Sequence, residues 1–181
     1  MIHKTAVIDP KAKIKIVGRR PGEKLHEELI SNIDATYTLD LNEFYIRNIL
    51  LRESLKIDYD NSYKTNVKAK MTKWKTKTRG ISLISNIITN DLLSDYKDQG
   101  YKLQVDDCWF AKYNKGEYTT SHNHLPSSFS FVYFLKSPVG SSSLVFTNSN
   151  KEIEPKEGRL VMFPSMLYHH VPPNNCNDRV V

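Results

Sequence analysis

The stretch LQVDDCWFAKYNKGEYTTSHNHLPSSFSFVYFL, residues 103–135, decides the fold class of this chain. Residues alternate between apolar and polar from Leu103 to Val105, and β-forming residues crowd the run from Cys108 to Tyr113. The run from Phe129 to Leu135 has the composition of a buried strand. Turn-forming residues separate these runs, so the pattern predicts a series of short strands.

The same pattern continues to the end of the sequence. The segment from Ser143 to Phe146 follows a turn at Gly140, and the segment from Arg159 to Phe163 follows a turn that ends at Gly158. Arg179 begins one more strand-like segment. Short strands at this spacing are typical of a β-sandwich or a jelly roll.

Helical periodicity lies upstream of this zone. Apolar residues from Leu83 to Leu93 recur at helical spacing, and Gly100 can end that helix. Nearer the N-terminus, Ile14–Val17 reads as a strand and Glu23–Ser31 as a helix, and Phe44–Ile46 is a further candidate strand.

The composition is that of an ordinary globular protein, with 39% hydrophobic and 25% charged residues among 181. No apolar run approaches the roughly 20 residues that span a bilayer. The N-terminus lacks the layout of a secretion signal. Cys108 and Cys176 do not have metal-ligand spacing and are expected as free thiols, so we predict a cytoplasmic protein.

The formal net charge is +6, with an excess of basic residues between Lys64 and Arg79. Such an excess can mark a partner that is a nucleic acid or another polyanion. No zinc-finger, helix-turn-helix or RNA-binding motif accompanies it, so a solvated basic face is the expectation, and no nucleic-acid partner is predicted.

Four of the six histidines lie at two places in the strand-rich zone: His122 and His124, and the adjacent His169 and His170. Residues i and i+2 of an extended segment point to the same face, about 7 Å apart, so His122 and His124 can converge on one ion. If the strands that carry the two sites are neighbours, the sites meet. Imidazole binds Fe, Zn, Cu and Ni, so the ligands alone do not select the metal.

From Trp109 onward the sequence resembles the 2-oxoglutarate and Fe(II)-dependent oxygenases, especially small phage and marine-bacterial members and, more distantly, the prolyl 4-hydroxylases. The resemblance rests on Trp109 to Asn114 with Gly116, His122-Asn123-His124, Ser130 to Leu135, Phe163 to His169, Val171 to Asn174, and Arg179, with Asn66 to Thr72 as a lead-in. It implies a mainly β fold, a double-stranded β-helix (jelly-roll) with a flanking helix, plus a small α/β N-terminal appendage.

The resemblance also implies roles for individual residues. His122, His124 and His169 match the metal ligands, although His124 stands where a carboxylate is usual. Arg179 matches the residue that binds the distal carboxylate of 2-oxoglutarate, a task suited to a guanidinium. Tyr113 and Tyr133 match tyrosines near the co-substrate.

Three neutral imidazoles leave an Fe(II) site one negative charge short of the usual two histidines and one carboxylate. Such a site can bind iron with charge supplied by 2-oxoglutarate, favour another metal, or be inactive. Asp106 and Asp107 are alternative carboxylates, but neither stands at a matching position.

The implied function is an iron- and 2-oxoglutarate-dependent dioxygenase that hydroxylates an unknown protein, nucleotide, lipid or sugar substrate. The cofactor is Fe(II), and 2-oxoglutarate is a small-molecule co-substrate. A non-catalytic jelly roll that binds a metal or a ligand is the alternative.

The segment from Ile14 to Ile30 resembles the C-terminal part of UDP-N-acetylglucosamine 4,6-dehydratases through its Arg20-Pro21-Gly22-Glu23-Lys24 run. The chain lacks the glycine-rich nucleotide loop and catalytic Tyr-x-x-x-Lys pair of those enzymes, so dehydratase activity is not expected. We predict a dehydratase-like appendage over residues 1–58 and an oxygenase-like domain over residues 59–181, whose last strand ends early at Val181. A fragment linked to nucleotide-sugar or polysaccharide synthesis is a further alternative.

Overall fold

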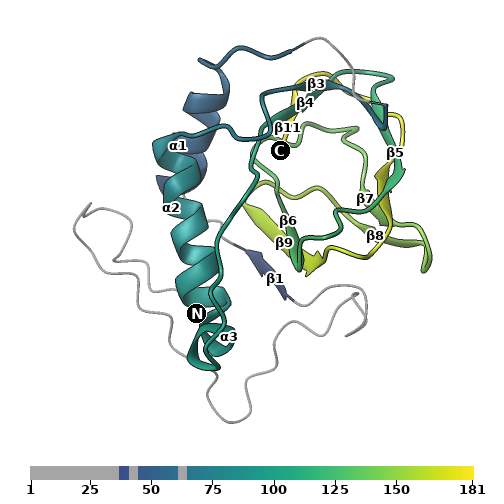
Figure 1. Ribbon diagram of the computed structural model, residues 1–181. Helices are drawn as coiled ribbons and strands as arrows, with labels where there is room; N and C mark the ends of the chain where they lie inside the picture. Colours follow the sequence, from purple (N-terminus) through teal and green to yellow (C-terminus); the bar gives the residue numbers. More distant parts are fainter. Residues whose placement is uncertain (1–36, 41–44, 61–64) are drawn as a thin grey trace.

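The computed structural model describes residues 37–40, 45–60 and 65–181. Helices lie along one side of a rolled β-structure (Figure 1). The elements are β1 (Tyr37–Asp40), α1 (Tyr45–Ser54), β2 (Val67–Lys68), β3 (Lys70–Met71), α2 (Arg79–Ile87), the π-helical segment η2 (Ile88–Leu92), α3 (Ser94–Asp98), β4 (Ala111–Tyr113), β5 (Tyr118–His122), β6 (Phe129–Tyr133), β7 (Leu144–Phe146), β8 (Lys151–Ile153), β9 (Arg159–Pro164), β10 (His169–Val171) and β11 (Arg179–Val180).

The strands form antiparallel sheets, which agrees with the predicted jelly roll. In order across each sheet, the strands are β1-β9-β6, β2-β5-β10-β7-β8 and β11-β4-β3. Neighbours in these sheets are far apart in the sequence: β5 pairs with β10, and β4 pairs with β11. The rolled arrangement therefore brings segments from both ends of the strand-rich zone to one place.

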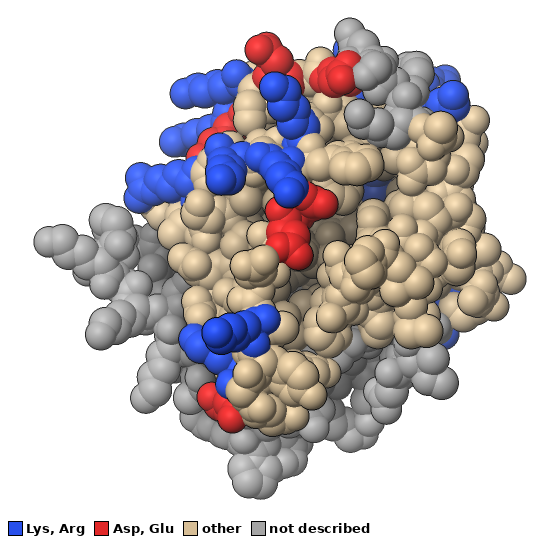
Figure 2. All heavy atoms as spheres, viewed as in Figure 1, with Lys and Arg blue, Asp and Glu red and all other residues tan. Residues whose placement is uncertain are grey.

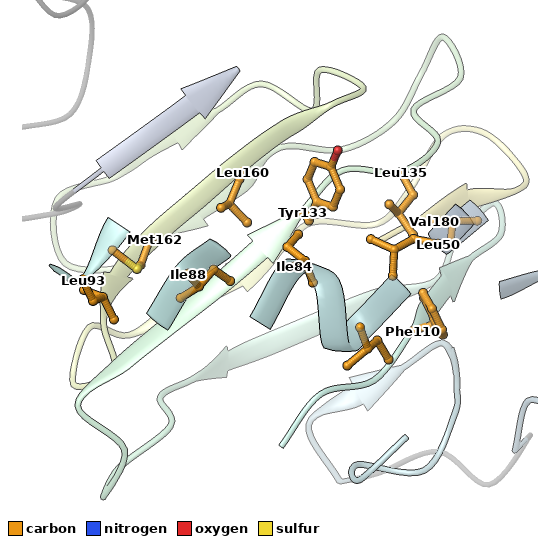
Figure 3. Packing of buried hydrophobic residues seen from close by; sticks show 11 residues of the cluster. Leu50, Ile84, Ile88, Leu93, Phe110, Tyr133, Leu135, Leu160, Met162 and Val180 are labelled. Carbon is orange, nitrogen blue, oxygen red and sulfur yellow. The ribbon is translucent and has the colours of Figure 1, made fainter. Parts of the chain in front are cut away.

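Strands β6 and β9 separate two apolar clusters, which explains why their sequences are largely apolar. Tyr133, Leu160 and Met162 pack toward the helices (Figure 3), whereas Val161 and Phe163 belong to the cluster inside the roll. Successive side chains of a strand point to opposite faces, so a sheet buried on both faces needs apolar residues at every position. Each such side chain contributes about 1.5–3 kcal/mol when fully buried.

Helix α2 covers the outer face of that sheet. The Thr78 hydroxyl caps its first turn by accepting from the backbone N–H of Ile81 at 3.2 Å. Ile81, Ile84 and Ile88 then face the core. The predicted helix is confirmed, and Gly100 follows its last part with a φ of +88°. Among the described residues, no helix is long and apolar enough to cross a bilayer.

Two local predictions are wrong. Residues 103–105 form no strand, since they have no partner strand in the described part of the chain. Tyr45 and Ile46 begin helix α1 instead of a strand, and Phe44 lies outside the described residues. Ile46 and Leu50, four positions apart, both contact the helix-side core, which is a helical spacing. The segments predicted at residues 14–17 and 23–31 also lie outside the described residues.

The described part of the predicted appendage packs on the rest of the chain. Strand β1 pairs with β9 in antiparallel register, and the backbone N–H of Gly80 in α2 donates to both carboxylate oxygens of Glu53 in α1, at 3.1 and 3.0 Å. The division between residues 58 and 59 stays a prediction.

The contact between α1 and α2 requires a glycine at position 80. A Cβ atom there would lie 2.6 Å from Glu53 Oε2 and 2.8 Å from a Leu50 methyl group. We therefore predict that Gly80→Ala lowers the free energy of unfolding by about 1–2 kcal/mol, measured by urea denaturation of the full chain. Asn86→Ala, an exposed site in the same helix, is the control and should leave stability unchanged or slightly raised. Equal stability of Gly80→Ala and the unsubstituted chain would contradict this packing.

Candidate metal centre

Two of the histidines singled out by the sequence face each other across a pair of strands. Strands β5 and β10 run antiparallel, and His122 lies directly opposite His169. Directly opposed residues place their side chains on the same face of a sheet. The two imidazole centroids are accordingly 4.4 Å apart.

His124 joins this pair from the segment that follows β5. Its backbone N–H donates to the carbonyl of Ser165 at 2.9 Å, which fixes the segment against the end of β9. The His124 ring lies 4.8 Å from the His122 ring and 5.1 Å from the His169 ring, between centroids. The ligand atoms of all three residues lie within 4.8 Å of one another. The predicted convergence of three imidazoles is therefore present.

Backbone carbonyls orient two of these rings. His122 Nδ1 lies 2.9 Å from the carbonyl oxygen of Thr120, and His169 Nδ1 lies 3.0 Å from that of Leu167. A proton on Nδ1 satisfies each carbonyl and leaves the Nε2 lone pair available. Histidine ligands of metals are commonly oriented in this way.

Burial keeps the three rings in the neutral form that binds metals. Desolvation lowers the pKa of His169 to about 3 and the pKa of His124 to about 4. The pKa of His122 is lowered for the same reason, against the hydrogen bond to Thr120. Burial disfavours charge, and each ring would also repel the charge on its neighbours.

The neighbouring candidates do not join the group. The Nδ1 atom of His170 lies 3.1 Å from Thr147 Oγ1, away from the three rings, as expected for the next residue in a strand. Among the described residues, the metal-binding group contains neither Asp106 nor Asp107. Asp106 instead accepts a hydrogen bond from the side chain of Gln104 at 2.7 Å. The centre therefore has three neutral donors.

Arg179 is the most unusual side chain of the interior. It is 1% exposed, and its Nε and Nη1 atoms are buried without a hydrogen-bond partner. Its guanidinium carbon lies 4.7 Å from the Tyr113 ring centroid and 5.6 Å from that of Phe134. No carboxylate of the described residues lies within 4.0 Å of it. A buried cation without an anion is costly, so this arrangement suits an anionic ligand.

The two predicted tyrosines lie in different places. Tyr113 is directly opposite Arg179 in the β4–β11 pair, and its hydroxyl is 2.7 Å from the hydroxyl of Thr119 in β5. Tyr133 packs in the helix-side cluster with Leu160 (Figure 3), whereas the ring of the next residue, Phe134, lies near Arg179. The structure therefore brings Tyr113 to the arginine but not Tyr133, because successive residues of a strand alternate in direction.

A single cavity of about 930 Å³ connects these groups. Its walls include the three histidines, Tyr113 and Arg179. Figure 2 shows a recess in the middle of the molecular face in view. Trp109, whose ring is 5.9 Å from that of His124, also lines the cavity. Sequence reasoning did not assign Trp109 to the site, although it noted the residue as part of the family pattern.

Comparison with protein families identifies the strand-rich part of the chain. Residues 107–181 match the family described as "Putative 2OG-Fe(II) oxygenase", and residues 1–49 match the family described as "Polysaccharide biosynthesis protein". No curated protein matches the sequence of this chain. The first family match confirms the predicted enzyme class, a dioxygenase that uses Fe(II) and 2-oxoglutarate.

Solved structures confirm the double-stranded β-helix fold. The viral collagen prolyl hydroxylase of Paramecium Bursaria Chlorella virus-1 aligns with a TM-score of 0.64 at 18% identity, over 80% of this chain and 91% of that one. A prolyl-4-hydroxylase of Pseudomonas putida aligns with a TM-score of 0.58 at 19% identity, over 75% and 81%. A Trichoplax adhaerens prolyl hydroxylase, solved with a hypoxia inducible factor peptide fragment, aligns with a TM-score of 0.60 at 17% identity, over 80% of each chain. Residues 107–181 therefore match the model of the 2-oxoglutarate and Fe(II)-dependent oxygenases, and the chain shares the fold of the solved prolyl hydroxylases.

Proposed function

We propose that His122, His124 and His169 hold one Fe(II) ion through their Nε2 atoms. The observation that carries this proposal is the cross-strand pair of His122 and His169, with His124 closing the group within 4.8 Å. The Nδ1 contacts of the paired rings to carbonyls support Nε2 as the donor. Imidazole is a suitable ligand for iron.

The charge of this centre differs from that of a two-histidine, one-carboxylate site. Three neutral rings leave the full charge of a divalent ion uncompensated by protein. A dianionic co-substrate then supplies the missing negative charge. This requirement favours a pocket that draws anions toward the metal, and Arg179 provides a second positive charge in the same cavity.

We assign the distal carboxylate of 2-oxoglutarate to Arg179. The Nε and Nη1 donors of the guanidinium are buried without a partner, and a guanidinium can hold a carboxylate with two parallel hydrogen bonds. The rings of Tyr113 and Phe134 lie 4.7 and 5.6 Å from the guanidinium carbon, and these contacts orient the group. Tyr133 also lines the cavity, but it packs in the helix-side cluster, so we do not assign it to the carboxylate.

Contacts of Asp178 and Val180 fix the end of β11, the strand that carries Arg179. Asp178 accepts from the ammonium group of Lys112 at 2.6 Å and lies 3.8 Å from that of Lys136. The backbone N–H groups of Leu135 and Lys136 donate to the carbonyl of Val180 at 3.0 and 3.1 Å. These contacts fix the end of β11 on both sides, so that the guanidinium points inward without an internal anion.

Fe(II) and 2-oxoglutarate supply at this site the oxidative decarboxylation of the co-substrate to succinate, coupled to hydroxylation of a C–H bond of the substrate. The protein residues bind and orient the reactants and exclude water. Phe163, with its ring 4.8 Å from His169, and Phe146 line the inner side of the histidines with apolar surface. Trp109 lies on the outer side, next to His124.

The wider setting of the protein also belongs to this proposal. Residues 1–58 are proposed as an appendage related to polysaccharide-synthesis proteins, supported by the family match at residues 1–49. A phage-type relationship and a cytoplasmic location remain predictions from the sequence.

We predict that anaerobic Fe(II) with 2-oxoglutarate gives a visible charge-transfer band, and that air then yields succinate. His122→Ala and His169→Ala should each weaken Fe(II) binding by about a hundredfold or more and abolish the band. His170→Ala is the matched control, since that ring lies next in the strand and contacts Thr147. A band with undiminished intensity in His169→Ala would overturn the ligand assignment. A band without succinate would favour a non-catalytic metal-binding protein.

If Arg179 binds 2-oxoglutarate, its substitution should weaken binding of the co-substrate but not of the metal. Arg179→Lys keeps a positive charge but lacks the two-pronged geometry, so we expect at least about a tenfold higher KM for 2-oxoglutarate. Affinity for the metal, measured without 2-oxoglutarate, should be unchanged. Arg159→Lys is the control, because the Arg159 guanidinium donates to the carbonyl of Glu154 outside the cavity. An equal KM for the Arg179 variant and the unsubstituted protein would contradict the assignment.

Burial of the histidines predicts weak competition between protons and metal. With an unperturbed pKa of about 6.5, the neutral fraction of each ring would be about tenfold lower at pH 5.5 than at pH 7.5. For three rings, the metal affinity would then fall by about a thousandfold. Because the pKa of His124 is about 4 and that of His169 about 3, Co(II) affinity should fall less than about tenfold between pH 7.5 and pH 5.5. Isothermal titration at the two pH values measures this, and a thousandfold fall would show that the rings titrate normally.

A further inference from the structure

The segment between Asp60 and Asp91 contains no acidic residue but seven basic ones: Lys64, Lys68, Lys70, Lys73, Lys75, Lys77 and Arg79. The whole chain has a formal net charge of +6, so this one segment accounts for the basic character of the protein. The side chains of Lys73, Lys75, Lys77 and Arg79 are exposed. We call residues 73–79 the basic segment.

The basic segment is fastened to the wall of the active-site cavity. The backbone N–H of Cys108 donates to the carbonyl of Trp74 at 2.7 Å, and the N–H of Thr76 donates to the carbonyl of Cys108 at 3.1 Å. Just before it, the N–H of Thr72 donates to the carbonyl of Phe110 at 3.0 Å. Trp74 and Trp109 both line the cavity. Trp74, half exposed within the basic segment, therefore lies at an entrance to the cavity, whereas the basic side chains of the segment do not line it.

Two indole rings connect this entrance to the histidines. Trp74 is 52% exposed, and its ring centroid lies 6.5 Å from that of Trp109. The Trp109 ring in turn lies 5.9 Å from the His124 ring. About half of the Trp74 side chain is exposed, so part of its large apolar surface is accessible from solution. The rings thus line a route from the basic segment to the metal ligands.

The acidic groups around the entrance do not neutralise the basic segment. Glu53 accepts from the backbone of Gly80, and Asp106 accepts from Gln104. Asp107 is exposed on the same wall of the cavity. Among the described residues, no carboxylate lies within 4.0 Å of the ammonium groups of Lys73, Lys75 or Lys77. Figure 2 shows basic side chains gathered over the upper ends of α1 and α2, with acidic side chains nearer the recess.

We propose that the basic segment, with Trp74 and Trp109, binds a single-stranded nucleic acid and presents it to the metal centre. Exposed and partly buried residues alternate from Lys75 to Arg79, so Lys75 and Lys77 lie on the same side, about 7 Å apart if fully extended. Spaced cations that follow a backbone, combined with aromatic rings on which bases stack, are the features that bind single strands without sequence preference.

Other polyanions fit only part of this surface. An acidic peptide or an acidic polysaccharide satisfies the lysines but offers no base to the exposed indole. A duplex carries the charge but keeps its bases stacked inside, so that neither tryptophan reaches a base face unless a base is flipped out. The sequence alone led us to expect a solvated basic face. The position of Trp74 beside Trp109, and of Trp109 beside His124, favours the single strand.

As a statement about the substrate, this inference rests on the proposed function, but binding itself does not need the metal. The test therefore uses the full chain in EDTA with fluorescein-labelled 15-nucleotide oligo(dT) and oligo(U), followed by anisotropy and by quenching of tryptophan fluorescence. We expect saturable binding with quenching, and tighter binding than to a glutamate 15-mer, a heparin fragment or a 15-base-pair duplex. If the protein binds the oligonucleotides but forms no succinate with Fe(II), 2-oxoglutarate and air, the proposed function alone is contradicted.

Substitutions locate the binding site. Lys75→Gln with Lys77→Gln should weaken binding about tenfold and reduce the slope of log K against log salt by about 1.4, or 0.7 for each lost phosphate contact. Lys115→Gln with Lys156→Gln removes the same charge at exposed positions outside the basic segment and is the matched control. Trp74→Ala should weaken binding about tenfold, with partial rescue by Trp74→Phe. Equal losses in the two lysine pairs, or an acidic peptide that binds as tightly as oligo(dT), would overturn the proposal.

Discussion

The register between β5 and β10 is the constraint on which the rest of the site depends. It places His122 opposite His169 and therefore on the same face of the sheet. A shift of one residue would turn one of these rings to the other face, toward the place that His170 now occupies beside Thr147. The neighbouring pair of β10 with β7 and the apolar cluster around Phe146 and Phe163 hold this register, because a slip would expose apolar side chains.

Charge links the histidines to the rest of the cavity. The three rings are kept neutral by burial, and Arg179 is buried without an internal counterion. A site with a divalent ion, no carboxylate ligand and an unpaired guanidinium is strongly cationic. Its stability with metal bound depends on an anion that enters from solution, which makes the co-substrate part of the electrostatics of the folded site. The lysines that flank Trp74 in the sequence add positive potential beside the cavity.

Much of the site could be predicted from the sequence because its determinants are local. The His-x-His spacing, the arginine ten positions beyond His169, and the turn residues before each strand are readable in order along the chain. The fold class followed from short apolar runs at regular spacing. The side-chain directions in and after β6 were harder to predict. Whether Tyr133 or Phe134 faces the arginine depends on which neighbouring layer packs against each face of the sheet.

Predictions from the sequence were wrong where long-range pairing overrides the local pattern. Residues 103–105 alternate like a strand, but a strand also needs a partner, and none of the described segments pairs with them. Ile46 looked like part of a strand because a short apolar run fits either period, and packing with Leu50 selects the helix. Trp74 and Trp109 are neighbours in space but 35 positions apart in the sequence, so no local pattern predicts their contact.

The most direct test of the central claim is X-ray absorption at the iron edge of the anaerobic, Fe(II)-loaded protein, with and without 2-oxoglutarate. We expect one iron per chain, with scattering from three imidazole rings in both states and with oxygen donors from 2-oxoglutarate replacing solvent in the second. Two or fewer imidazoles around the iron, or a protein carboxylate in its first coordination shell, would contradict it.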